Sequence, residues 1–356
     1  MRVAARARMT EPGGDGLTYI LPIKCAVPHA ADELAAYLRW LAERAEVIVV
    51  DGSPSAVFAA HAAAWREAIH TGLRHAVPAA DLMTPMGKVG GVLTGLRLAS
   101  HERIIIADDD VRYDDRALAR VAAALEGADV IRPQNYFDPL PWHACWDTGR
   151  MLLNRLTGGD WPGTIGVRRS VLRATGGYAG DAMFENLELV RTVIAAGGHE
   201  TALLGVYVLR HPSTTRHFWG QRVRQAYDEF ARPGRLVMQL ALLPVATALA
   251  ATGRWGMLAA GVVAVTLAAE MGRRRAGGRH VFPPRASLLA PAWVAERAVC
   301  SWLALGARIV LHGIPYRGTV LRHAATPMRV LRARHAAARE LAPSDRRPGI
   351  RRHQSA

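Results

Sequence analysis

Short apolar runs alternate with longer amphipathic stretches in the first third of this sequence, and this alternation limits the possible folds most. Runs of this kind are YILPI at 19–23, VIVV at 47–50 and IIIA at 104–107. A run that is apolar at every position is typical of a strand covered on both faces. Strands separated by helices indicate βαβ units. We therefore predict an α/β domain built around a central sheet.

Acidic residues follow two of these runs. The second run ends in Asp51 and Gly52, and the third leads into Asp108, Asp109 and Asp110. In open α/β sheets, ligands bind beyond the carboxyl ends of the strands. Alternate side chains of an extended segment point the same way, so Asp108 and Asp110 can converge on one Mg²⁺ or Mn²⁺ ion that also binds a diphosphate. The alternatives are a cap on the following helix for the three acids and a turn-forming role for Asp51.

The chain as a whole is basic, with a formal net charge of +15 at pH 7. The excess is mostly arginine, which suits phosphates or anionic lipid headgroups, and we expect a membrane partner and no nucleic acid. Cys25, Cys145 and Cys300 have no CxxC spacing, so neither a disulfide framework nor a thiolate zinc site is expected. Residues 1–16 contain no apolar run typical of a signal peptide and are predicted to form a disordered leader.

Two apolar stretches, 236–252 and 255–271, set the C-terminal part apart. Each has about the minimum length of a membrane-spanning helix, roughly 17 residues. Arginines flank the pair, which places both ends on the cytoplasmic side. We predict a transmembrane or re-entrant hairpin over 233–275, after an α/β domain over 17–232. The alternative is a buried helical hairpin of a soluble protein.

Within the region after the hairpin, 276–327, the segment 286–312 is apolar but interrupted by Glu296, Arg297 and Arg308. If it crossed the membrane, the arginine-rich tail would lie outside, against the positive-inside rule. We therefore predict an amphipathic region lying at the membrane interface. Residues 328–356 are predicted to form a basic, disordered tail.

A series of short segments resembles the family 2 glycosyltransferases with a GT-A fold. In order they are ILPIK, VIVVDGS, GKVGGVLTGL, IIIADDDV, GGY followed by FENLEL, and QRVRQ. The resemblance covers residues 18–230 and is strongest to membrane-associated members such as ceramide glucosyltransferase and the cellulose and hyaluronan synthases. It implies a nucleotide-binding α/β domain with a mixed sheet, followed by a hydrophobic, membrane-associated helical region. It also implies transfer of a sugar from a UDP- or GDP-sugar to an acceptor hydroxyl.

The resemblance assigns roles to four residues near the strand ends. Asp51 resembles the acid that contacts the base or ribose. Lys88 resembles a lysine near the nucleotide sugar, with a solvated loop lysine as the alternative. Asp108 and Asp110 resemble the D-x-D pair that binds the nucleotide sugar and its cation, with Asp110 as the more direct metal ligand.

The expected general base is missing from its usual place. Many relatives carry E-D-x-x-L, whose Asp takes the proton from the acceptor hydroxyl, whereas FENLEL has Asn186 at that position. An amide cannot accept this proton usefully. We expect Glu185 to supply the base, with Glu188 as the second candidate. The alternative is that both glutamates only cap or solvate the helix.

The segment QRVRQ resembles the Q-x-x-R-W motif of membrane synthases, which holds the acceptor end and the diphosphate. Gln221 and Arg224 match, while Gln225 replaces the tryptophan. Positions i and i+3 share a helix face, so Arg224 is expected to contact the leaving diphosphate. The nearby tryptophans Trp142, Trp146 and Trp161 predict either a binding surface or a second, smaller sheet.

Together these residues predict a metal-dependent, inverting glycosyltransferase at the cell inner membrane, with its catalytic domain facing the cytoplasm and a lipid or polyprenyl-linked acceptor. Asn186 motivates a second hypothesis, a catalytically impaired membrane protein that binds a nucleotide sugar as a partner or regulator. A nucleotidyltransferase would need a glycine-rich and basic loop after the first strand, which LPIKCAVPHAAD does not provide.

Overall fold

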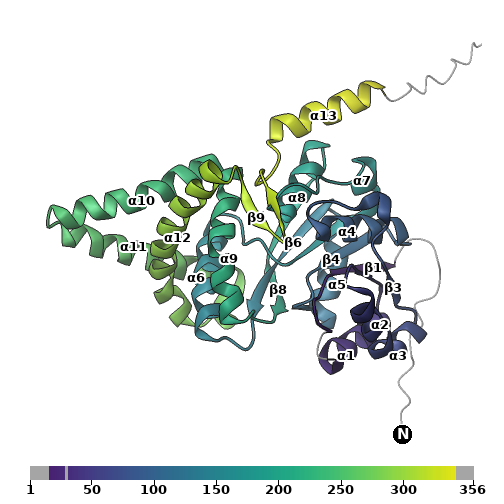
Figure 1. The fold of residues 1–356 in the computed structure, drawn as a ribbon. Helices are drawn as coiled ribbons and strands as arrows, with labels where there is room; N and C mark the ends of the chain where they lie inside the picture. Colours follow the sequence, from purple (N-terminus) through teal and green to yellow (C-terminus); the bar gives the residue numbers. More distant parts are fainter. Residues whose placement is uncertain (1–15, 29–30, 342–356) are drawn as a thin grey trace, which may run out of the picture.

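The computed structural model describes residues 16–28 and 31–341. The expected leader, apart from Gly16, and the part of the expected tail beyond residue 341 lie outside the described residues. A sheet with helices on both faces forms one side of the molecule, and a group of longer helices forms the other (Figure 1).

The central sheet has eight strands in the order β3-β2-β1-β4-β7-β6-β8-β5. Strands β1 to β4 are parallel to their neighbours in this group, and β7 is antiparallel to both β4 and β6. The predicted mixed sheet is therefore confirmed. The strands are β1 (Leu17–Ile23), β2 (Glu46–Asp51), β3 (Arg74–Ala76), β4 (Arg103–Ala107), β5 (Val111–Arg112), β6 (Val130–Phe137), β7 (Thr164–Arg168) and β8 (Glu200–Arg210).

Both faces of the sheet are covered, which explains why β4 is apolar from Ile104 to its end. Ile104 and Ile106 belong to one hydrophobic core and Ile105 to the other, because successive side chains alternate between the faces. The first core includes α4 (Gly87–Leu98) and α8 (Glu185–Ala195). The second includes α1 (Ala31–Ala42), α3 (Arg66–His70) and α5 (Asp115–Ala124), with α2 (Ser55–Ala64) beside α1.

The helical side of the molecule is built around α6 (Trp142–Leu156), which packs against α11 (Trp255–Arg274) and α12 (Pro284–Val310). The helices come very close where glycine is present. A Cβ on Gly149 of α6 would lie 3.0 Å from the Ala290 Cα of α12, and one on Gly272 of α11 would collide with the Leu152 carbonyl of α6. Glycines at these two crossings therefore let the helix backbones touch.

Helices α10 (Pro233–Ala251) and α11 form an antiparallel hairpin that projects from the rest of the molecule (Figure 1). Gly253 makes the tight turn with a φ of 70°, which glycine adopts without strain. In each of the two spans of the hairpin, only 11% of the most apolar 18-residue stretch is buried. The alternative of a buried hairpin in a soluble protein therefore does not fit.

Among the described residues, three helices are long and apolar enough to cross a membrane, namely α10, the span that starts with α11, and α12. Helix α12 is a single helix of 27 residues, and 39% of its most apolar 18-residue stretch is buried. Its Arg297 is buried, and the Glu296 side chain is only 7% exposed. Two of the three charges that led us to expect an interfacial helix therefore face protein, whereas Arg308 is exposed.

Two expectations from the sequence are wrong. Residues 328–341 of the expected disordered tail form helix α13 (Met328–Leu341), which packs against α8 and buries Leu331. Alanine and arginine are strong helix formers, so this composition also suits an ordered helix.

Trp142 and Trp146 lie one turn apart on α6, so they do not belong to a second sheet. The second sheet consists of β9 (Ile314–Tyr316) and β10 (Thr319–Leu321).

Candidate active site

Charged side chains from separate elements meet at the carboxyl end of β4. Lys88 Nζ lies 2.5 Å from Asp108 Oδ1 and 2.7 Å from Glu185 Oε1. Lys88 is the second residue of α4, so it does not lie in the loop that the sequence suggested, and Glu185 is the first residue of α8. Two helix starts thus bring a cation and an anion to the acids that follow β4.

Arg210, the last residue of β8, binds both acids of the D-x-D segment. Its Nε lies 2.9 Å from Asp110 Oδ2, and its Nη2 lies 3.3 Å from Asp108 Oδ2. The two carboxylates therefore reach the same guanidinium from one side of the backbone. Gly163 leaves the necessary space, because a Cβ there would lie 2.8 Å from Asp108 Oδ2.

The pKa values reflect this crowding of charges. Burial raises the pKa of Asp110, although the Arg210 guanidinium opposes the shift and the Asp108 charge adds to it. Burial opposes ionisation of Lys88, but the charges of Asp108 and Glu185 outweigh it and raise the pKa of the ammonium. Lys88 is therefore a permanent cation between two carboxylates.

The acids after β4 also fit a divalent cation in their chemistry. Asp110 Oδ1 is buried and has no hydrogen-bond partner among the described residues, and carboxylate oxygens are the ligands that Mg²⁺ and Mn²⁺ prefer. The described part of the chain holds no cluster of three or more His, Cys, Asp or Glu side chains suited to a metal. A cation bound here would therefore take its remaining ligands from a substrate or from water.

Asp51 is enclosed within the protein at the end of β2. Its Oδ2 lies 2.7 Å from His61 Nδ1 and 3.2 Å from His75 Nε2, while its Oδ1 accepts a hydrogen bond from the Ser53 amide. Burial opposes ionisation, but these hydrogen bonds, with the largest effect from His75, hold the pKa of Asp51 well below its usual range. The bond from Ser53 is the turn geometry that we considered as the alternative role of Asp51.

Helix α8 separates the two candidate bases. Glu185 faces Lys88, whereas the buried Glu188 accepts a hydrogen bond of 2.6 Å from the Thr326 amide of the C-terminal segment. Asn186 donates from Nδ2 to the Pro162 carbonyl at 3.1 Å. Only Glu185 of these residues touches the charged cluster at β4.

Helix α9 (Thr215–Tyr227) places its two motif residues differently. Gln221 lines a cavity and contacts His217 and Gln225. The Arg224 guanidinium instead lies over the Tyr316 ring, 5.7 Å from the ring centroid. Gln221 therefore lies at the cavity, and the arginine that α9 contributes to the cavity lining is Arg222 and not Arg224.

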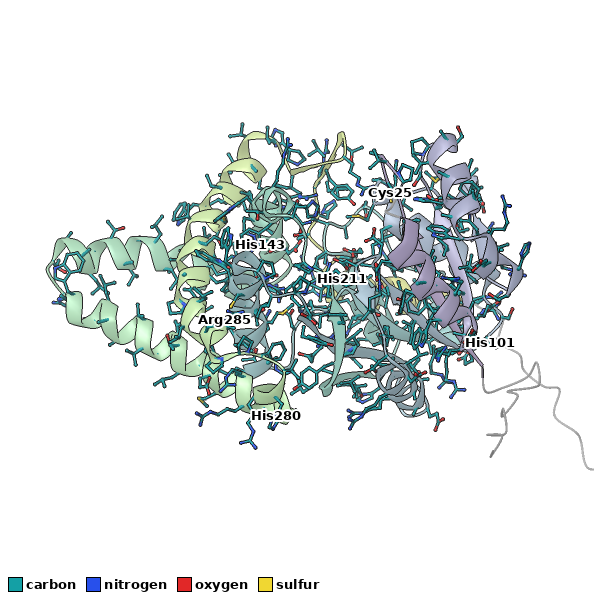
Figure 2. The ribbon with its side chains drawn as sticks, turned by 90° about the horizontal axis from the view of Figure 1, so that it is seen from below. Cys25, His101, His143, His211, His280 and Arg285 are labelled. Atoms are coloured by element: carbon teal, nitrogen blue, oxygen red, sulfur yellow. The ribbon has the colours of Figure 1, made fainter. Side chains whose placement is uncertain are left out.

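The cavity lies among α6, α9, α12 and the segment after β8, and has a volume of about 200 Å³. His143 in Figure 2 marks the part contributed by α6, and its Nε2 lies 2.7 Å from the Ser213 carbonyl. The basic side chains lining the cavity are mainly arginines: Arg150, Arg210, Arg222, Arg232, Arg235 and Arg297. The carboxylates lining it are Asp110, Asp147, Asp228 and Glu229.

Asp228 is a cavity residue that sequence reasoning missed. It begins the 3₁₀ helix η2 (Asp228–Ala231) directly after α9, and its buried Oδ1 has no hydrogen-bond partner within the described residues. Burial, followed by the charge of Glu185, raises the pKa of Asp228 to about 8, although Arg232 and Arg297 oppose the shift. Asp228 is therefore largely protonated at neutral pH.

The comparisons with known proteins bear on the fold. No family model and no curated protein matches the sequence. The mannosyltransferase PcManGT from Pyrobaculum calidifontis, solved with GDP-Man and Mn²⁺, is similar in structure, with a TM-score of 0.54 and 18% sequence identity. The match covers 82% of this chain and 88% of that chain. The fold is of the GT-A type.

The GT-A match is not confined to the sheet. Residues 17–232 make up less than two thirds of the chain, so coverage of 82% includes part of the C-terminal helical side. Glucosyl-3-phosphoglycerate synthase from Mycobacterium tuberculosis, solved with Mn²⁺, UDP and glucosyl-3-phosphoglycerate, has a TM-score of 0.40 and 14% identity over 60% of this chain and 78% of that chain. The match to PcManGT confirms the predicted GT-A fold, and the likeness to the ceramide glucosyltransferase group remains a prediction.

Proposed function

We propose that this protein is a glycosyltransferase that moves a sugar from a nucleotide-diphosphate sugar to a lipid-linked or other membrane-proximal hydroxyl acceptor. The observation that carries this proposal is the meeting of Asp108, Asp110, Lys88 and Glu185 at the end of β4 in a GT-A fold. The resemblance of the sequence motifs to the ceramide glucosyltransferase and cellulose synthase group supports it.

The donor site combines carboxylates with permanent cations. Asp108 and Asp110 would hold Mg²⁺ or Mn²⁺, which would supply charge neutralisation on the departing diphosphate. Lys88 and Arg210 already contact these acids and are placed to bind phosphate oxygens of the same group. The relative PcManGT was solved with both GDP-Man and Mn²⁺, which is in keeping with such a site.

Glu185 is the base in this proposal. Its carboxylate takes the proton from the acceptor hydroxyl while that oxygen bonds to the anomeric carbon and the bond from this carbon to the diphosphate breaks. A single displacement of this kind inverts the anomeric configuration. Lys88 pairs with the Glu185 carboxylate before the donor binds, and a shift of Lys88 toward the donor phosphate would free the carboxylate for proton transfer.

The helical side of the molecule supports a site at the membrane. Three helices are long and apolar enough to span a bilayer, and arginines flank the α10–α11 hairpin on the side of the α/β domain. By the positive-inside rule this side is cytoplasmic, so we place the catalytic domain on the cytoplasmic face of the inner membrane.

Donor turnover tests the proposal directly. The full chain in detergent, mixed with a membrane lipid extract and Mn²⁺, should release nucleotide diphosphate from one of a set of UDP- and GDP-sugars. Glu185→Gln should abolish turnover while metal-dependent nucleotide binding survives, and Glu126→Gln, which changes an exposed glutamate just after α5, is the matched control. Full activity of Glu185→Gln would move the base elsewhere.

The second candidate is a nucleotide-sugar-binding protein without turnover. It is favoured by Asn186, which occupies the expected place of the base and donates a structural hydrogen bond to Pro162. This candidate predicts metal-dependent nucleotide binding in the same assay with no diphosphate released from any donor. That result would overturn the enzyme proposal.

A further inference from the structure

Three arginines in the cavity have buried donors without partners. Arg222 and Arg297 are 3% and 2% exposed, and Arg232 lies beside them in the cavity lining. The Nε atoms of all three are buried and have no hydrogen-bond partner among the described residues. They come from α9, α12 and the start of α10, so tertiary packing gathers them at one place.

Burying these donors without hydrogen-bond acceptors costs free energy. A guanidinium does not lose its proton in proteins, so it cannot escape the cost of burial by becoming neutral. A buried donor without an acceptor is unfavourable, because buried polar groups are nearly always hydrogen-bonded. Arg222 and Arg232 each have a carboxylate partner, but the three buried Nε atoms have no acceptor among the described residues, which indicates that a further acceptor belongs in the cavity.

The carboxylates that line the cavity do not supply an acceptor for every donor of these arginines. Asp147 is shared by Arg150 and Arg222, and Glu229 is shared by Arg232 and Arg235. Arg297 forms no ion pair with any described residue; it packs over the Trp293 ring, 5.1 Å from the ring centroid. Each shared carboxylate compensates for only part of the charge of its arginines.

The donors without acceptors, and not the net charge, point to an anion. Arginines of the cavity lining also pair with carboxylates outside it, namely Arg150 with Asp160, Arg210 with Asp108 and Arg222 with Glu296. Guanidinium groups present planar, paired donors that match phosphate oxygens. A cavity of about 200 Å³ has room for a phosphate group.

The position of the cavity relates this anion to the membrane helices. Arg297 lies on α12 and Arg232 directly precedes α10, and both helices are candidate membrane spans. Further along α12, Val299 and Leu303 are exposed apolar side chains. An alkyl chain attached to the phosphate could therefore follow apolar helix surfaces away from the cavity.

We propose that this cavity binds the phosphate group of a phosphate-bearing acceptor, with the guanidinium groups of Arg222, Arg232 and Arg297 as its hydrogen-bond donors. The proposal deepens the glycosyl transfer proposed above and rests on it, because it names the chemistry of the acceptor. The donor nucleotide is assigned to the acids and Lys88 at the end of β4, and of the donor-site residues Asp110 and Arg210 also line the cavity. The two ligands should therefore bind side by side, the acceptor phosphate at the three arginines, without excluding each other.

Binding of dodecyl phosphate to the full chain in dodecyl maltoside micelles tests this site. We expect dodecyl phosphate to bind and dodecanol at the same concentration not to bind. Arg297→Gln should weaken binding about tenfold or more, the loss expected for a charge-assisted hydrogen bond to phosphate. Arg285→Gln removes an exposed arginine from the same helix, labelled in Figure 2, and should leave binding unchanged.

A competition experiment on the unaltered chain keeps the test independent of folding of the variant. Inorganic phosphate should displace dodecyl phosphate, and excess UDP or GDP with Mn²⁺ should not. Binding of dodecyl phosphate about tenfold tighter than butyl phosphate would identify a lipid as the source, and equal binding would identify a soluble phosphate ester.

Three results would overturn the proposal: equal binding by Arg297→Gln and the unaltered chain, equal binding of dodecanol and dodecyl phosphate, or displacement by the nucleotide. Nucleotide binding and diphosphate release in the same preparation show whether the proposed function itself survives. If they persist while dodecyl phosphate does not bind, only the acceptor assignment fails. If phosphate binds but no donor is bound or turned over, the glycosyltransferase proposal fails.

Discussion

Lys88 Nζ donates to Glu185 Oε1 at 2.7 Å and so joins the first turn of α4 to the first residue of α8. The same ammonium lies 2.5 Å from Asp108 Oδ1. One cation thus links the proposed base to the proposed donor site. Binding of a donor phosphate by Lys88 would weaken its hold on Glu185, which couples donor binding to release of the base.

Replacing Lys88 by Gln should weaken nucleotide-diphosphate binding about tenfold or more, because a charge-assisted hydrogen bond contributes about 1.5–3 kcal/mol. Calorimetric titration with UDP and GDP in Mn²⁺ measures the change. Arg116→Gln, which removes an exposed cation from α5, serves as the control. Unchanged affinity in Lys88→Gln would remove this lysine from the donor site.

Asp110→Asn should make nucleotide binding insensitive to Mn²⁺. The substitution removes one of the two carboxylates that would hold the cation, while the amide oxygen can still accept from Arg210. Titration of nucleotide with Mn²⁺ and with a chelator gives the comparison. If the variant keeps the full Mn²⁺ effect, the cation is bound by other groups.

The stability of the protein should fall as pH rises toward 8, in part because of Asp228. Its pKa is about 8 when folded and has an ordinary value of 3.8, so between these values the folded chain keeps a proton that the unfolded chain releases. The proton favours the folded state most at the acidic end of this window, and the benefit is lost as pH approaches 8.

Denaturant unfolding of the unaltered chain and of Asp228→Asn across pH 5 to about 9 measures this effect. The stability of the unaltered chain relative to the variant should decrease with pH and become constant above about 8. Parallel curves for the two proteins would show that Asp228 ionises at an ordinary pKa.

Glu188→Ala should lower the free energy of unfolding by about 1–3 kcal/mol, because it leaves the Thr326 amide without its buried acceptor. Diphosphate release per folded molecule should stay close to normal, in contrast to Glu185→Gln. Thermal unfolding and a donor assay on the same samples separate the two effects. Loss of turnover with unchanged stability would instead make Glu188 the base.

Val263→Asp should reduce membrane association of the hairpin. Val263 is exposed near the middle of α11, where a charged residue costs roughly 2.5–3.5 kcal/mol in a bilayer. The fraction of protein that stays with membranes after an alkaline wash is the measurement. Val77→Asp places the same charge on an exposed valine of the α/β domain, so equal retention of both variants would argue against insertion of α11.

The strands and the acids could be predicted because they depend on local pattern. The run from Ile104 to Ile106 shows burial on both faces, and Asp108 and Asp110 follow it at once. The partners of these acids are far away in the sequence. Arg210 ends a strand roughly a hundred residues later, and no spacing rule connects it to Asp110.

The cavity was missed for a related physical reason. A single arginine such as Arg297 in an apolar helix looks like an interruption, and only the packing of α12 against α9 buries it. Arg222 and Arg224 differ by two positions, which turns them to different sides of α9. The motif directed attention to Arg224, whereas Arg222 is the buried one.

Gly149 and Gly272 let the backbone of α6 contact the backbones of α12 and α11 directly, with no side chain of either glycine between them. Backbones in direct contact leave little freedom for a hinge between the hairpin and the rest of the chain. A bilayer of different thickness would then be accommodated by tilting of the whole molecule. The height of the proposed catalytic site above the lipid headgroups would in this way be set by how deeply the hairpin inserts.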